Sequence, residues 1–318
     1  MKKKEAYHEK VIFVFICVLT LTSCAPLSSR YGDQRLRGGP KFSAPRPASF
    51  VRKKISLLPF FNESSKSPMD LGEVATEELK KGLSRSKEFL VNPEGTRVLF
   101  VPSRQIYTQA GSDLAAMAKS AKLSGISFII YGRVIDARAF IDRDEAGFFK
   151  KSLAQAKAKV EIRVFDVNSN REVSHRILEG SYRKENFRFY QRKKEGSHLS
   201  RYRQLLRHVV KKAVRKGLPL IAQAARKTEW TGRVAKIIGS KIYISAGRKS
   251  GIQLGDVMKV MTEGTEIYDP QSGTLIGVSE GELKGTLEVI DYFGPDGAVA
   301  ILHSGGSIIK GDFVRLYE

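Results

Sequence analysis

The sequence contains few of the residues that form disulfides, metal sites and nucleophilic centres. Its 318 residues include two Cys, five His and one Trp. Both Cys17 and Cys24 lie near the amino terminus, and no two His have the short spacing of a metal-ligand pair. We therefore predict no metal site, no cofactor and no disulfide, so that the folded part depends on its hydrophobic core for stability.

Motifs of the common enzyme classes are also lacking. The sequence has no Gly-x-Ser-x-Gly nucleophile elbow, no Gly-x4-Gly-Lys-Ser/Thr phosphate loop and no Gly-x-Gly-x-x-Gly after an expected strand. Asp142, Asp144 and Glu145 form an acidic cluster that is typical of a polar hairpin tip, with a carboxylate pair for hydrolysis as the alternative. We predict no catalytic residues and a protein that is not an enzyme.

The apolar run near the amino terminus is too short to cross a bilayer. Val11–Leu21 has 11 residues, whereas a transmembrane helix needs roughly 20. The run follows a Lys-rich segment and leads into Leu21–Cys24 (Leu-Thr-Ser-Cys). This arrangement is typical of a secretory signal peptide, and its last four residues resemble the lipobox of bacterial lipoproteins. An ordinary signal peptide with a chance Cys is the alternative.

The lipobox resemblance implies a processed and lipid-anchored chain. Residues 1–23 would be removed, and Cys24 would carry acyl chains, palmitate among them, that hold the chain to a membrane. Ala25, in place of Asp, implies sorting to the outer membrane, with the chain on the periplasmic face. Residues 24–50 are rich in Pro, Gly, Ser and Arg and have no apolar periodicity, which predicts a flexible tether.

The positive charge is concentrated in one part of the chain. The whole sequence carries +22. Residues 229–318 contain nine Lys and Arg and twelve Asp and Glu, a net charge of −3, so that residues 24–228 carry +23. Such a field favours anionic partners, which in the cell envelope are lipid head groups, peptidoglycan carboxylates or acidic protein faces. We predict no nucleic-acid partner, because the compartment lacks nucleic acid and the sequence lacks its binding motifs.

Residues 51–227 show strand and helix patterns in the order β-α-β-α-β-β-β-α. We expect strands and helices, in chain order, at 55–61, 70–83, 97–101, 113–123, 126–135, 158–167, 173–182 and 199–216. Asp70 and Asp113 are expected helix N-caps. This pattern predicts a basic α/β domain whose helices lie on one side of a sheet.

The last of these helices is the best candidate for a binding surface. Between residues 183 and 216 there are thirteen Lys and Arg against two Glu, interleaved with aromatic residues. Apolar residues recur every three or four positions from Leu199 to Ala213 and would pack on the sheet. The residues that we predict to contact an anionic partner are Arg188, Arg192, Lys193, Lys194, Arg201, Arg203, Arg207, Lys211 and Lys212. A solvated charged face is the alternative interpretation.

Residues 228–318 consist of short apolar runs broken by Gly, and they repeat. Residues 232–237, 241–244 and 252–260 are echoed in order by 285–290, 298–301 and 308–316. The repeat predicts a small all-β barrel with approximate internal two-fold symmetry, so that the whole chain is of the α+β class. Gly255-Asp256 and Gly311-Asp312 are expected tight turns in which Asp has a structural role.

The first module resembles a periplasmic α/β fold. The pattern is carried by Ile55–Phe60, Tyr131–Val134 and the hairpin at 165–172. It is similar to the amino-terminal domain of the Tol translocation protein, the curli secretion channel lipoprotein and the lipoprotein activators of penicillin-binding proteins.

The second module resembles the carboxy-terminal domain of flagellar assembly protein T. Tyr268–Gly277 contains an Asp-Pro-Gln-Ser-Gly hairpin followed by Leu-Ile-Gly, and Gly285–Val289 begins a strand with Gly. The resemblance implies a ring component of the flagellar basal body that assembles by contacts between copies. The chain departs from that family in having a lipid anchor and tether instead of an additional amino-terminal domain.

Two functional classes follow. The first is a scaffold or assembly lipoprotein that docks to a periplasmic protein machine, in its specific form a homo-oligomeric flagellar ring. The second is a regulatory or secretion-associated lipoprotein, either an activator of a cell-wall synthase or a channel like that of curli secretion. A channel requires long alternating hairpins, for which Arg138–Gln155 is the only candidate.

Overall fold

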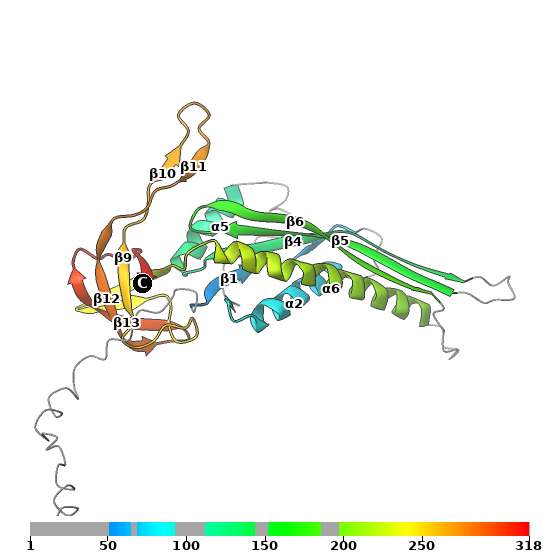
Figure 1. Ribbon diagram of the computed structural model, residues 1–318, viewed down its shortest axis with the longest axis horizontal. Coiled ribbons are helices and arrows are strands. Elements are labelled where there is room, and N and C mark those ends of the chain that lie inside the picture. Colours follow the sequence, from blue (N-terminus) through cyan, green and yellow to red (C-terminus); the bar gives the residue numbers. More distant parts are fainter. Residues whose placement is uncertain (1–50, 65–68, 93–111, 144–151, 186–196, 318) are drawn as a thin grey trace, which may run out of the picture. The chain divides into compact units, whose positions relative to one another are not determined.

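The computed structural model describes residues 51–64, 69–92, 112–143, 152–185 and 197–317, all within one compact unit of the chain. A mixed sheet with three helices is followed by a closed six-strand antiparallel barrel, which confirms the predicted α+β class (Figure 1). The α/β module contains β1 (Lys53–Leu57), β2 (Phe61–Asn62), α2 (Leu71–Arg85), β3 (Phe89–Val91), α5 (Ser112–Leu123), β4 (Phe128–Arg143), β5 (Ser152–Asp166), β6 (Arg171–Glu185) and α6 (Ser197–Arg226).

The sheet has the order β3-β1-β4-β5-β6, with β2 paired to β4. β1 runs parallel to β3 and β4, whereas β4, β5 and β6 are antiparallel. The strands expected at 126–135 and 158–167 are longer in the structure, because β4 and β5 stay paired from Phe128 with Asp166 to Arg143 with Ser152. β3 was not predicted, and the strand expected at 97–101 lies outside the described residues.

Helices cover both faces of this sheet, so the prediction of helices on one side is wrong. The alternating residues Val160, Ile162 and Val164 of β5 are buried with α2 and α6 in the largest apolar cluster. Phe165, which points the other way, is buried with Ile129 of β4 beneath α5 in a separate cluster. Ile129 and Tyr131 of β4 and Phe165 of β5 are buried on this second face and required a second helix layer, which we had not inferred.

The helix ends agree with the sequence in one case and differ in two. The Asp70 side chain accepts hydrogen bonds from the backbone N–H groups of Gly72 and Glu73 at 2.8 and 3.2 Å, which confirms the predicted N-cap of α2. Asp113, in contrast, lies inside α5, which begins one residue earlier. The helix expected at 199–216 continues to residue 226 through Pro219, because its buried apolar face extends further along the sheet.

The barrel module follows α6 and has internal two-fold symmetry. One copy of the repeat supplies β7 (Gly232–Ile238), β8 (Lys241–Ile244) and β9 (Val257–Met261), and the other supplies β12 (Leu283–Phe293), β13 (Gly297–Gly305) and β14 (Phe313–Leu316). The closed order is β12-β13-β8-β7-β14-β9, and exchanging the two copies leaves every strand pairing unchanged.

The two predicted Gly-Asp turns are equivalent in detail. Gly255 and Gly311 have φ angles of 82° and 97°, which favour glycine. Asp256 and Asp312 each accept a hydrogen bond from the backbone N–H three residues earlier, at 2.7 and 2.8 Å. The N–H of each glycine donates to a carbonyl in the first strand of the other copy, at 2.8 and 2.9 Å. Both Asp residues therefore have the structural role that the sequence predicted.

A separate two-stranded hairpin, β10 (Glu266–Tyr268) and β11 (Leu275–Val278), extends from the barrel (Figure 1). Its turn has the predicted chemistry. Asp269 Oδ1 accepts from the N–H groups of Gln271 and Ser272 at 2.9 and 2.8 Å, and Gly273 has a φ of 64°. None of the described helices is both long and apolar enough to cross a membrane.

Candidate functional site

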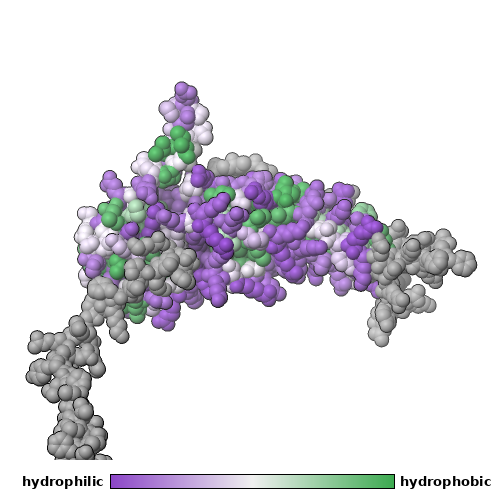
Figure 2. Space-filling view, viewed as in Figure 1, coloured by the Kyte–Doolittle hydropathy of each residue, from purple (hydrophilic) through white to green (hydrophobic). Residues whose placement is uncertain are grey.

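The predicted anionic-partner residues fall into two groups. Four of them lie outside the described residues, as does Cys24: Arg188, Arg192, Lys193 and Lys194. The other five lie along α6: Arg201, Arg203, Arg207, Lys211 and Lys212. The side of the molecule on which α6 lies is largely hydrophilic (Figures 1 and 2).

Several cations of α6 are used within the fold. Arg215 Nε lies 2.6 Å from the carboxylate of Glu78 on α2, and Lys211 Nζ lies 3.7 Å from the same group. Glu78 is buried, so these two cations neutralise a charge between the two helices. This contact gives Lys211 a structural role beside any role in binding.

Two further lysines cover the edge strand of the sheet. Lys212 Nζ and Lys216 Nζ donate to the carbonyl oxygens of Ser181 and Glu179 on β6, at 2.9 and 2.8 Å. β6 ends the described sheet, and lysines at such an edge discourage pairing with another strand. Lys212 thus also contributes to the fold.

Arg203 and Arg207 form the most accessible part of the predicted surface. Both are exposed, and neither has an acidic partner among the described residues. Arg201 is half-buried and already interacts within the fold. Leu199, which we expected on the buried face, is 49% exposed and adds an apolar side chain to the same end of the helix. An anionic partner of α6 would therefore contact Arg203 and Arg207 first.

A polar network on the opposite face of the sheet was missed. Glu161 on β5 is only 1% exposed, yet it is ionisable. Its carboxylate contacts Arg133, lies 2.6 Å from Arg163 Nη2 and lies 2.7 Å from His175 Nε2. Burial alone would raise the pKa of Glu161, but hydrogen bonds from Arg163 and Arg133 outweigh it and hold the pKa below its usual value. Because Arg133 and Arg163 both contact this carboxylate, its surroundings are those of a structural ion and not of a general acid.

The β10–β11 hairpin exposes apolar side chains far from any core. Ile267, Tyr268 and Ile276 are 49%, 52% and 60% exposed, and hydrophobic residues gather on this hairpin in Figure 2. The sequence predicts the hairpin but not the exposure of its flanks, because alternation in so short a strand does not show which face is covered. The described residues hold no group of three His, Cys, Asp or Glu that could bind a metal ion.

Comparison with known proteins gives a partial likeness. No protein-family model and no curated protein matches this sequence. Among solved structures, protein CT253 from Chlamydia trachomatis is 16% identical over 56% of this chain and 100% of its own, with a TM-score of 0.38. A minor lipoprotein from Acinetobacter baumannii is 16% identical over 55% of this chain and 94% of its own, with a TM-score of 0.27. Lipoprotein GNA1162 from Neisseria meningitidis is 16% identical over 54% and 99%, with a TM-score of 0.26.

These likenesses are partial and concern the fold alone. The comparisons give no support to a flagellar assignment.

Proposed function

We propose that this chain is an assembly lipoprotein of the cell envelope, anchored through Cys24 on the periplasmic face of the outer membrane. It acts by binding proteins and not as an enzyme. The observation that supports this role best is the β10–β11 hairpin, whose Ile267, Tyr268 and Ile276 are about half exposed. A two-stranded hairpin alone is marginally stable in water, so apolar side chains on its surface favour a protein partner that covers them.

The contact that we propose is with a second copy of the chain. The hairpin and its connections carry a set of acidic residues, namely Glu263, Glu266, Asp269, Glu280 and Glu282. The α/β module is strongly basic and presents Arg203 and Arg207 on α6. Opposite charges on two different surfaces of one chain favour head-to-tail association, which closes into a ring when the rotation between copies is suitable.

The specific form of this proposal is a ring around the flagellar basal body. It rests on the motif at Tyr268–Gly277, which resembles flagellar assembly protein T. The alternative is a regulatory or secretion-associated lipoprotein, such as an activator of a cell-wall synthase or a secretion channel. In that case the hairpin would bind a different protein.

In-cell photo-crosslinking tests these alternatives. Tyr268 is replaced by a photoreactive phenylalanine analogue in the lipidated chain, and crosslinked products are isolated and identified by mass spectrometry. We expect a ladder of chain-to-chain adducts, with crosslinked peptides from α6. Flagellar basal-body proteins in the same adducts would support the specific form.

The matched control carries the same analogue at Leu254, which is also 52% exposed but lies on the barrel outside the hairpin. Equal adducts from both positions would mean random collision. Adducts with a peptidoglycan synthase, and none between copies, would replace the scaffold proposal by the regulatory one.

A further inference from the structure

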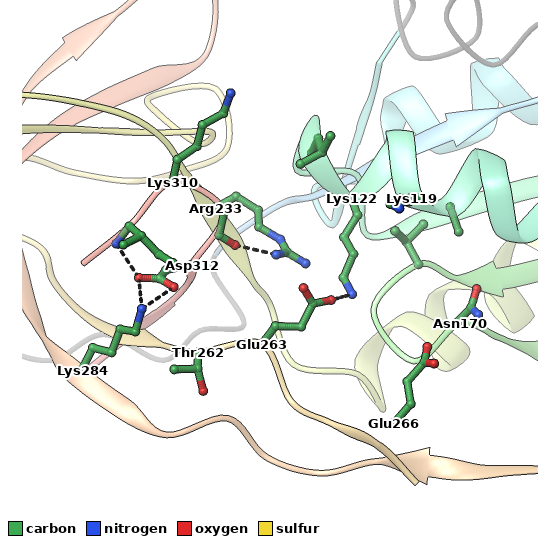
Figure 3. A pocket seen from close by; sticks show the side chains of 15 residues that line it. Lys119, Lys122, Asn170, Arg233, Thr262, Glu263, Glu266, Lys284, Lys310 and Asp312 are labelled. Atoms are coloured by element: carbon green, nitrogen blue, oxygen red, sulfur yellow. Dashed lines mark hydrogen bonds and ion pairs between the residues drawn. The ribbon is translucent and has the colours of Figure 1, made fainter. Parts of the chain in front are cut away.

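A cavity of about 560 Å³ lies between α5 and the barrel and gathers basic side chains. Its lining includes five cations, Lys119, Lys122, Arg233, Lys284 and Lys310, and three carboxylates. Figure 3 shows Arg233, Lys122 and Glu263 pointing toward one another from β7, α5 and the segment after β9. The volume is within the range of small-molecule sites, and the lining carries a net positive charge.

Arg233 is the most unusual residue of this cavity. It is 5% exposed, and its guanidinium lies 3.4 Å from the centre of the Phe313 ring. One terminal nitrogen, Nη1, donates to the carbonyl of Gly311 at 2.6 Å. The other, Nη2, is buried and has no acceptor among the described residues. Burying an unpaired N–H of a charged group costs free energy. An acceptor from outside the chain would remove this cost.

The acidic residues of the cavity do not supply that acceptor. Asp312 accepts from Lys284 Nζ with both oxygens, each at 2.9 Å. Glu263 is paired with Lys122. Burial, and after it the neighbouring Arg233, lower the pKa of Lys122 to about 8.

The internal repeat shows that the barrel does not need an arginine here. Gly232-Arg233 in the first copy corresponds to Gly285-Thr286 in the second. Thr286 is also buried, at 8% exposed, and its hydroxyl is satisfied by Ser304 at 2.7 Å. A small neutral side chain thus fills the equivalent position, with its hydroxyl hydrogen-bonded. Arg233 replaces it at the side that faces the cavity.

We propose that this cavity binds a small molecule or head group that bears a phosphate, with Arg233 Nη2 donating to a phosphate oxygen. Arg233 and Lys122 would hold the phosphate, as guanidinium and ammonium groups do at other phosphate sites. Leu123 and Ile309, which also line the cavity, provide an apolar wall for the rest of the ligand. Glu263 and Glu266 of the hairpin's acidic set also line this cavity, but Arg233 and Lys122, which would hold the phosphate, are not part of the hairpin contact.

Titration calorimetry of the full lipidated chain in a neutral detergent tests the proposal. The probes are inorganic phosphate, glycerol 3-phosphate and a short-chain phosphatidylglycerol, all at constant ionic strength. We expect saturable binding of inorganic phosphate. The affinity should fall at least about tenfold in Arg233→Gln, because the substitution removes one charged hydrogen bond. Lys122→Gln should also weaken phosphate binding. Because Lys122 lies at the edge of the cavity, this second variant still tests the site if Arg233→Gln fails to fold.

The matched control is Arg248→Gln, an exposed arginine of the same barrel that does not line the cavity, and it should bind phosphate as the unchanged chain does. Tighter Arg233-dependent binding of phosphatidylglycerol would identify a lipid head group as the source. If glycerol 3-phosphate binds as tightly as phosphatidylglycerol or more tightly, the ligand is a soluble one. No saturable binding, or binding that is the same in Arg233→Gln, would overturn the proposal.

Discussion

Glu161 is a buried carboxylate that contacts two arginines, on β4 and β5, and His175 on β6. Replacing it by Gln would remove the buried anion between Arg133 and Arg163, which would keep only their contacts with Glu63 and Glu172. Because both arginines are partly exposed, at 29% and 28% of their side chains, we expect a loss of about 2–3 kcal/mol in the free energy of unfolding, below the value for a fully buried pair. Urea unfolding of Glu161→Gln measures this loss.

Glu179→Gln is the matched control, because its side chain is 65% exposed and pairs with Lys159 on the surface. It should change stability by less than about 0.5 kcal/mol. A Glu161→Gln variant as stable as the unchanged chain would contradict the structural role of this network.

The same carboxylate makes stability depend on acid pH. The folded-state pKa of Glu161 lies below the value of 4.5 expected in the unfolded chain. Its contribution is therefore present above that value and is lost as the pH falls through the folded pKa. Between pH 5 and acid unfolding, we expect a shallower loss of stability in Glu161→Gln than in the unchanged chain, measured by urea midpoints at each pH.

Lys122 makes stability depend on alkaline pH. Its pKa is lowered from 10.5 to about 8 by burial and by Arg233, against the attraction of Glu266 and Asp166 and the contact with Glu263. Because the folded chain releases this proton before the unfolded chain does, stability should rise between about pH 8 and 10.5. Thermal unfolding across this range should show the rise, and Lys122→Met should reduce it. A decline of equal size in both proteins would contradict the shifted pKa.

At the scale of elements, Gly180 of β6 allows α6 to lie close to the sheet. A Cβ added to Gly180 of β6 would lie 1.9 Å from the backbone carbonyl oxygen of Val209 on α6. The helix would have to move away from the sheet, which would open the core around the buried Val209 and Ala213. We expect Gly180→Ala to cost at least about 3 kcal/mol, as overpacking of a core does, measured by chemical denaturation.

Gly277 in β11 is the matched control, because a Cβ added there meets nothing within 4 Å. Gly277→Ala should be close to neutral. If both substitutions were neutral, α6 would not be held as closely to β6 as the structure describes.

Elements were predicted where a local signal determines them. The cap at Asp70, the turns at Gly255 and Gly311, and the hairpin at Asp269 all follow from side chains that bond their own backbone. The far end of α6 did not follow, because Pro219 and Gly217 are local signals for a helix end. Packing of the later apolar residues of α6 against the sheet outweighs them.

At the scale of the whole molecule, the uneven charge makes the proposed self-association sensitive to salt. The head-to-tail contact joins a module of net charge −3 to a segment of +23. Screening shortens the range of such attraction from about 8 Å at 0.15 M salt to about 3 Å at 1 M. Sedimentation velocity should show association that weakens at least about tenfold between these conditions. Arg203→Glu together with Arg207→Glu should weaken it at low salt.

Tyr268→Ser should reduce association at both salt concentrations, because it removes apolar contact area and not charge. Association that strengthens with salt would show that the contact is purely apolar, and the basic face of α6 would then have no part in it.

The barrel could be predicted from the sequence, whereas the cavity could not, and the difference has a physical reason. The barrel and its symmetry followed from the repeat, since each copy buries its apolar strands only against the other. The cavity did not follow, because Lys122 and Arg233 are 111 positions apart in the sequence and their neighbourhood depends on tertiary packing. The visible signal was Arg233 in place of the neutral Thr286 of the other copy.

The position of β14 has a consequence for how the chain matures. β14 is hydrogen-bonded between β7 and β9, so the barrel cannot close until Phe313–Leu316 has been synthesised. A polypeptide truncated before Phe313 would leave two strand edges unpaired and accessible to proteases. Closure by β14 therefore protects the edges of β7 and β9 at the same time.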